Sequence, residues 1–95
     1  MHCTADTENG DYIDDPTEGQ LRDLIAGLGQ ATGTFITIGP ADDTQDWYAS
    51  VSLLPDGTTE IERADPSRSE HHRATVTASP ADIARQLTTW LSTRS

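Results

Sequence analysis

The chain has 95 residues, a length that fits one small domain with a single hydrophobic core. Sixteen acidic residues face six basic residues, all of them arginine, which gives a net charge of −10. This charge argues against binding to nucleic acid, because such binding needs basic patches that displace counterions from phosphate. It also argues against binding to an anionic membrane surface. A basic protein partner is compatible with it, and so is a charge that serves solubility alone.

The first ten residues are polar and lack periodicity, so we expect a disordered tail over 1–10 and a single α+β domain over 11–95. The N-terminus has neither the basic end nor the apolar stretch of a signal peptide. No apolar run approaches the roughly 20 residues of a membrane span. The one cysteine, Cys3, excludes an internal disulfide. A cytoplasmic protein is the simplest interpretation.

Residues 11–14 are expected to form a short strand or an extended lead-in to the first helix. Asp15, Pro16 and Glu18 then provide a capping residue, a proline suited to the first helical position and a capping-box acid. The apolar side chains that follow have the i, i+3, i+4, i+7 spacing of one helix face: Leu21, Leu24, Ile25 and Leu28. Because Gly29 suits a helix end, the pattern predicts a helix over 16–28.

The middle of the chain has the pattern of strands. Residues 34–38 are β-branched and aromatic, and residues 47–53 alternate between apolar and polar side chains. A Pro-Asp-Gly sequence at 55–57 is a strong turn signal. Residues 58–63 are therefore expected to form the partner strand of a hairpin, with Ile61 as their main apolar residue.

The last third of the chain predicts one strand and one helix. After a polar loop over 65–69, alternation from His72 to Thr77 indicates a last strand with His72 half-buried. Ser79 and Pro80 then begin a helix over 80–92, and Trp47 and Trp90 are both expected in the core. The expected fold class is α+β: an antiparallel sheet of four to five strands with two helices on one face, in the order (β)αββββα.

The segment Ser69-Glu70-His71-His72-Arg73 poses a choice between a metal site, a catalytic centre and an ordinary strand edge. Neighbouring residues on a strand point to opposite faces, so His71 and His72 cannot easily share one metal, and a zinc site needs three or four ligands. No serine lies in a G-x-S-x-G elbow. We therefore expect neither a metal site nor a catalytic residue, and a polar strand edge is the favoured interpretation.

Acidic residues cluster near an aromatic one along the predicted hairpin. Glu60 and Glu62 share one strand face opposite Ile61, and Tyr48 lies on the wetter face of its own strand. An acidic patch with an aromatic anchor suits docking to a basic protein. The alternative is an ordinary solvated face. The candidate partner-binding residues are Asp42, Asp43, Asp46, Tyr48, Glu60 and Glu62.

The order of motifs resembles the Imm1-like family of bacterial immunity proteins over roughly residues 11–93. Two motifs carry the resemblance: the helix start Asp15-Pro16-Thr17-Glu18, and His71-His72-Arg73 before the last helix, with His72 where an aromatic is common in that family. The resemblance implies a cytoplasmic protein without catalysis or cofactor. It would bind one cognate toxin, often a nuclease or a nucleic-acid deaminase, and block it.

Two other hypotheses remain. The chain is compatible with a small accessory or scaffold domain that forms a homodimer through the hairpin edge. It is also compatible with a hydrolase that uses Ser69 or Ser79 together with His71 or His72. A doubled mass without any partner would favour the first hypothesis, and loss of activity in a double histidine-to-alanine variant would favour the second.

Overall fold

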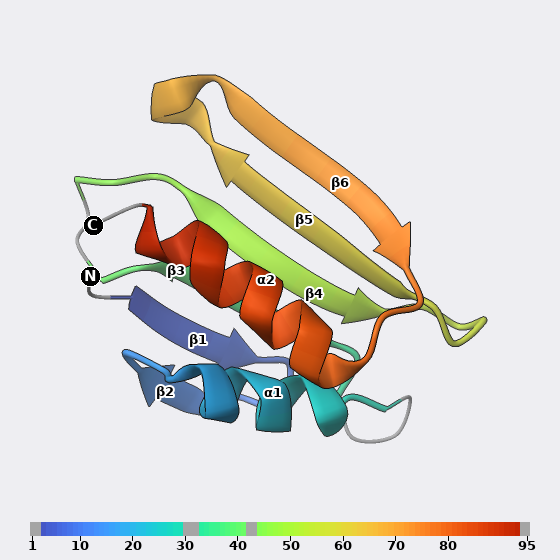
Figure 1. Ribbon diagram of the computed structural model, residues 1–95. Coiled ribbons are helices and arrows are strands. Elements are labelled where there is room, and N and C mark those ends of the chain that lie inside the picture. Colours follow the sequence, from blue (N-terminus) through green and yellow to red (C-terminus); the bar gives the residue numbers. More distant parts are fainter. Residues whose placement is uncertain (1–2, 30–32, 42–43, 94–95) are drawn as a thin grey trace.

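The structure is a computed structural model that describes residues 3–29, 33–41 and 44–93. These residues form a sheet and two helices, with a short 3-10 turn at Pro66–Arg68 (Figure 1). In chain order the elements are β1 (Cys3–Thr7), β2 (Tyr12–Asp14), α1 (Glu18–Ala26), β3 (Phe35–Pro40), β4 (Tyr48–Leu53), β5 (Thr59–Asp65), β6 (Glu70–Val76) and α2 (Pro80–Ser92).

The sheet is antiparallel throughout and has the strand order β2-β1-β3-β4-β5-β6. The hairpin between β4 and β5 forms around the predicted turn. Gly57 takes a positive φ of 89°, which glycine adopts without steric cost, and the Leu54 N–H donates to the Thr58 carbonyl at 2.8 Å. The backbone N–H and the side-chain hydroxyl of Thr58 both donate a hydrogen bond to the Asp56 carboxylate. The sequence prediction of this hairpin is confirmed.

The predicted disordered tail over residues 1–10 is wrong for Cys3–Thr7. These five residues form β1, an interior strand with hydrogen-bonded neighbours on both sides. Cys3 and Ala5 are buried against the helices, and they are too small and too few to produce a recognisable strand pattern. The α+β class is confirmed, but the described part of the sheet has six strands because β1 adds one to the predicted four to five.

Helix α1 begins later than predicted. Its N-cap is Thr17, whose hydroxyl accepts the Gln20 N–H at 3.1 Å while the Gln20 side chain accepts the Thr17 N–H at 2.9 Å. Asp15 instead has a positive φ of 53°, which excludes the extended backbone of an N-cap, and its N–H donates to the Cys3 carbonyl. The helix ends at Gly27 rather than at Gly29.

Helix α2 has the predicted bounds, and its cap is the predicted Ser79, which accepts the Asp82 N–H at 3.2 Å. Its buried residues recur with the helical period: Ile83, Ala84, Leu87 and Leu91. No helix within the described ranges is long and apolar enough to cross a membrane.

Both helices lie on one face of the sheet, as predicted (Figure 1). The core fills the space between the two layers and includes Ile36, Ile38 and Val51 from the sheet and Leu21 and Leu87 from the helices. Trp47 is buried as predicted, whereas Trp90 is only partly buried and contacts the Trp47 ring edge to face, with ring centroids 5.8 Å apart. The opposite face of the sheet carries no helix, and we call it the open face.

Candidate functional site

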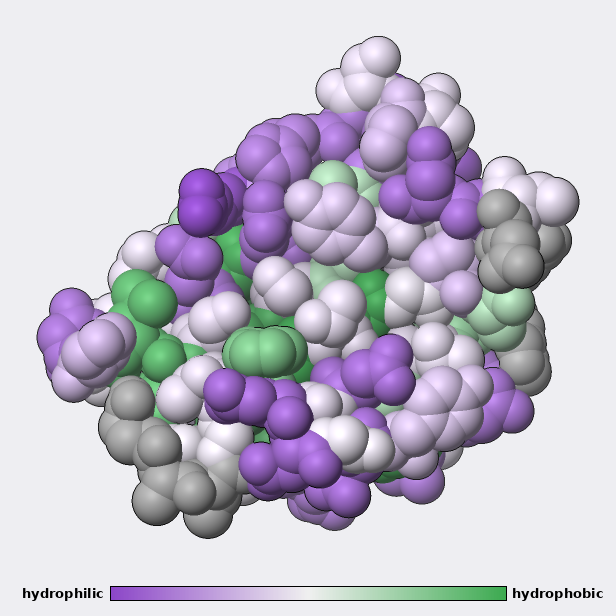
Figure 2. All heavy atoms as spheres, turned by 180° about the vertical axis from the view of Figure 1, so that it is seen from behind, coloured by the Kyte–Doolittle hydropathy of each residue, from purple (hydrophilic) through white to green (hydrophobic). Residues whose placement is uncertain are grey.

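The open face consists of the alternate strand residues that point away from the helices. In β4 and β5, Ala49, Val51 and Ile61 are buried against the helices, so the residues between them point outward. Across the sheet these outward side chains are largely small and polar, or acidic. Figure 2 shows this face as a mixture of hydrophilic and hydrophobic areas without a deep cleft.

Three large aromatic side chains are the most prominent feature of the open face. Tyr12 is 60% exposed, Phe35 is 40% exposed and Tyr48 is 37% exposed, and they are the large hydrophobic residues that the described part of the chain leaves exposed. Strand register places all three on the same side of the sheet, since Tyr12 pairs with Asp6, Phe35 with Ser52, and Tyr48 with Ala64. An antiparallel sheet with one solvated face does not require aromatic residues there.

The outward carboxylates of β5 pair with basic side chains on β6. Nε2 of His71 lies 2.7 Å from a carboxylate oxygen of Glu62, and Nε of Arg73 lies 3.4 Å from one of Glu60. Both pairs are diagonal, because Glu62 lies directly opposite Arg73 in the register and Glu60 directly opposite Thr75. The two strands therefore present a row of paired acidic and basic side chains rather than a purely acidic one.

Tyr48 extends this row into β4, because its hydroxyl donates to the Glu62 carboxylate. The hydrogen bond from His71 is the main reason that the pKa of Glu62 is lowered, and the bond from Tyr48 contributes. Desolvation raises the pKa of Tyr48, and the negative charge of Glu62 raises it further. Tyr48 is therefore a neutral hydrogen-bonded donor at physiological pH, and Glu62 is a carboxylate.

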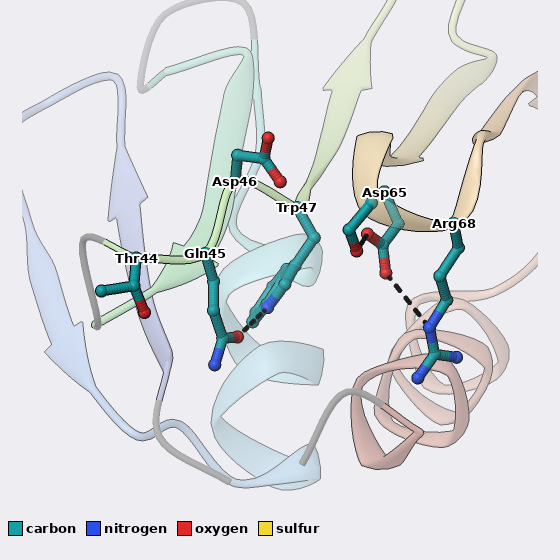
Figure 3. A pocket seen from close by; sticks show the side chains of 7 residues that line it. Thr44, Gln45, Asp46, Trp47, Asp65 and Arg68 are labelled. Atoms are coloured by element: carbon teal, nitrogen blue, oxygen red, sulfur yellow. Dashed lines mark hydrogen bonds and ion pairs between the residues drawn. The ribbon is translucent and has the colours of Figure 1, made fainter.

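The structure brings together half of the predicted partner-binding residues. Tyr48, Glu60 and Glu62 lie on the open face as the strand alternation predicted. Asp46 is exposed in the loop before β4, and Figure 3 shows its carboxylate pointing away from the side chains of Gln45 and Trp47. The other two predicted residues, Asp42 and Asp43, lie outside the described residues.

Sequence reasoning missed four acidic or basic residues of this face. His71 and Arg73 come from β6, and the available signal was the short loop after β5, which fixes the β5–β6 register. Asp6 and Asp14 are exposed on β1 and β2, near the opposite edge of the sheet from β6. Asp6 was missed because residues 1–10 were predicted to be a tail. With these additions the strands of the open face carry four carboxylates and one arginine, so the face remains acidic.

A small depression of about 170 Å³ lies beside Trp47, at the end of the sheet where β5 turns into β6 (Figure 3). The Trp47 indole N–H donates to the Gln45 side chain at 2.7 Å. The buried carboxylate of Asp65 accepts the Ser67 hydroxyl at 2.6 Å and lies 3.7 Å from the Arg68 guanidinium. These groups satisfy one another, which indicates that they hold the end of the hairpin together.

The two histidines lie on opposite sides of the sheet. His71 belongs to the open face, whereas His72 lies across from Arg63 on the helix side and is exposed rather than half-buried as predicted. Among the residues that the structure places, no group of three or more histidine, cysteine or acidic side chains is arranged to hold a metal ion. Cys3 of β1 is buried on the helix side of the sheet, and this burial raises the pKa of its thiol.

Comparisons with known proteins give no match: no protein-family model, no curated protein and no solved structure resembles the chain significantly. The likeness to the Imm1-like family therefore depends on the two short motifs quoted above. Of these, Asp15-Pro16-Thr17-Glu18 contains the true helix cap, Thr17, and His71-His72-Arg73 is part of β6.

Proposed function

We propose that this chain is a protein-binding domain that docks the basic surface of a protein partner on its open face. The observation that carries the proposal is that Tyr12, Phe35 and Tyr48, from three different strands, are all exposed on the one sheet face that no helix covers. Exposed apolar groups of this size on a small protein are typical of interaction sites when they are grouped on one surface.

The chemistry of the open face suits protein contact. Tyrosine and phenylalanine supply large contact areas with little loss of side-chain entropy, and they are enriched among residues that dominate binding energy. The serines and threonines around them, such as Thr37, Ser50 and Ser52, offer hydrogen bonds on a flat surface. The two longer dimensions of the molecule, 34 and 24 Å, correspond to the roughly 800 Å² that each partner contributes to a standard interface.

The resemblance to immunity proteins identifies the kind of partner in this proposal. An enzyme that acts on nucleic acid presents a basic cleft, and the net charge of −10 would speed the approach of this chain to such a cleft. Carboxylates of the open face would then occupy positions that the phosphates of the substrate normally take. In this proposal the chain acts in the cytoplasm, neutralises one cognate toxin and needs neither catalysis nor a cofactor.

Co-purification from the cells that carry the gene tests the proposal. We expect one basic protein to be recovered with the tagged chain in a 1:1 ratio, to be toxic when produced alone, and to be neutralised by the chain. Glu62→Lys should weaken the complex at least about tenfold, since a reversed charge in the interface repels a basic partner. Asp23→Lys is the matched control, because it makes the same change of charge at another paired carboxylate, the partner of Arg22, which lies on α1.

Two results would contradict this function. One is recovery of the chain without any stoichiometric partner. The other is equal weakening by Glu62→Lys and Asp23→Lys, because it would show that overall charge matters and that the open face does not.

Homodimerisation is the second candidate, and β6 is the observation that favours it. This seven-residue strand is the last in the sheet and is largely exposed, so its outer edge can pair with another strand. Pairing of β6 with its copy would give a concentration-dependent mass of twice 10.3 kDa. Sedimentation equilibrium of the isolated chain distinguishes this candidate from the immunity function.

A further inference from the structure

A groove lies on the helix side of the molecule, between α2 and the strands β5 and β6. Figure 1 shows these two strands extending past α2, whereas the helices lie over the remaining strands. Three depressions of about 70, 420 and 470 Å³ follow one another there, and Arg63 lines all three. Trp90 lines the two larger ones, and His72 and Gln86 each line two of the three.

The groove is wide enough to hold one additional helix, and part of its floor is apolar. Strands lie about 4.8 Å apart and packed helices 8–10 Å apart, so two helices cover about four strands of a six-stranded sheet. The uncovered floor is apolar where Ile61, Ala74 and Val76 line it, and one wall is the outer flank of α2 with Gln86. An apolar stripe on a third helix would complete the layer.

Arg63 gives the groove a chemical preference. Every other arginine in the described part of the chain has a carboxylate within 4 Å: Arg22, Arg68, Arg73 and Arg85. Arg63 has none, and its Nε–H is buried without an acceptor. In a chain with sixteen acidic residues, the unpaired guanidinium lines a groove that has room for an outside group. A buried donor of this kind is normally satisfied by a protein group or by an ordered water.

We infer that this groove binds an amphipathic helix of another protein, and that a carboxylate on this helix pairs with Arg63. The apolar residues of the helix would lie over Ala74, Val76 and Trp90, as in other helix-in-groove complexes. A second copy of this chain fits the groove less well, because a two-fold contact would bring Arg63 and Arg85 of each copy toward those of the other. The groove lies on the opposite side of β5 from the open face, because neighbouring residues on a strand point to opposite sides, and His71 at the sheet edge is the open-face residue that also lines one of its depressions.

Selection from a displayed library of helical peptides with one randomised face, followed by NMR titration of the ¹⁵N-labelled chain, tests this inference. The enriched peptides should combine an apolar stripe with a central aspartate or glutamate. They should shift the amide signals of Ala74, Gln86 and Trp90 and the Nε–H signal of Arg63. Signals of Tyr48 and Glu60 on the open face should not move.

Variants of the two faces make the result specific. Arg63→Gln should weaken the best peptide at least about tenfold, since it removes a charge-assisted contact. The matched control is Arg73→Gln, which removes an arginine from the open face of the neighbouring strand and should change the affinity less than about twofold. Gln86→Glu places a competing carboxylate on the wall of the groove and should also weaken the peptide, with the fold intact because Gln86 is exposed.

Several outcomes would overturn the inference. They are the absence of enriched peptides, enrichment of peptides without a carboxylate, signal shifts on the open face, and equal effects of Arg63→Gln and Arg73→Gln. A doubled mass that Arg63→Gln abolishes would show that a second copy of the chain is the occupant. The absence of enriched peptides, or equal effects of Arg63→Gln and Arg73→Gln, would leave the toxin proposal intact, because that proposal depends on the opposite face.

Discussion

Replacement of Arg63 by methionine is expected to stabilise the isolated protein. The Nε–H of Arg63 is buried and lacks an acceptor, and an unsatisfied buried donor costs about 1–3 kcal/mol. Methionine keeps an apolar side chain of similar length over the groove and removes the donor. Because Arg63 as a whole is only partly buried, we expect the lower end, a gain of about 1 kcal/mol in the free energy of unfolding. For a domain of this size that gain raises Tm by about 4–8 °C.

The matched control is Arg73→Met on the open face. It breaks an ion pair at 3.4 Å whose side chains are 59% and 30% exposed, and such a pair contributes at most about 1 kcal/mol. Urea denaturation followed by the fluorescence of Trp47 and Trp90 measures both variants. Arg63→Met should shift the midpoint upward and Arg73→Met slightly downward. A loss of stability in Arg63→Met would refute the reasoning, because it would show that the guanidinium stabilises the folded chain.

Three further predictions concern the core, a helix cap and a carboxylate. Leu87→Ala should lower the free energy of unfolding by about 3–5 kcal/mol in urea denaturation, because Leu87 is 1% exposed between α2 and the sheet. The control variant Gln86→Ala, at the exposed neighbouring residue, should change the free energy of unfolding by less than about 0.5 kcal/mol. Thr17→Ala removes the cap of α1 and should cost about 1 kcal/mol in thermal denaturation followed by circular dichroism, and an unchanged Tm would contradict the capping box. The pKa of Glu62 is lowered mainly by the hydrogen bond from His71, so its contribution to stability is full above about pH 4.3 and disappears as the pH falls through the lowered pKa. Glu62→Gln should therefore lose less stability than the parent chain between about pH 5 and pH 2, and parallel urea midpoints over that range would contradict this.

The elements that the sequence predicted best are those whose determinants are local. Helix α2 has its cap residue, its proline and its apolar spacing within fourteen consecutive residues, 79–92. The β4–β5 hairpin has its turn and both alternating strands within a similarly short segment. Helix α1 shows the limit of local signals, since Asp15 and Thr17 both begin plausible capping boxes. A hydrogen bond from Asp15 to β1, distant in sequence, decides between them.

Strand β1 was not predictable for a physical reason. Its sequence, Cys-Thr-Ala-Asp-Thr, buries only two small side chains, so its stability comes from hydrogen bonds to β2 and β3 on either side. Those bonds depend on where the neighbouring strands lie, which no property of residues 3–7 specifies. The same dependence hid Asp6 as a member of the open face.

The candidate sites differ in the same way. Alternation along one strand was sufficient to place Tyr48, Glu60 and Glu62 on the outward face. The pairing of the two glutamates with His71 and Arg73 required the β5–β6 register, which sets the diagonal contacts. The groove required still more, because its wall is α2, whose position over the sheet results from packing of the whole core.

Side chains along β5 alternate between the two faces of the sheet, and this alternation has a functional consequence in a protein of only two layers. Glu62 and Arg63 are neighbours in sequence, yet one belongs to the aromatic, acidic open face and the other to the groove beside α2. Because the molecule is only 19 Å across in its shortest dimension, neither face has the depth to enclose most of a small molecule, as ligand pockets normally do. Both faces have instead the breadth that contact with another protein requires. In the two proposals the same strand serves two different partners, and the charges that it presents to them are opposite in sign.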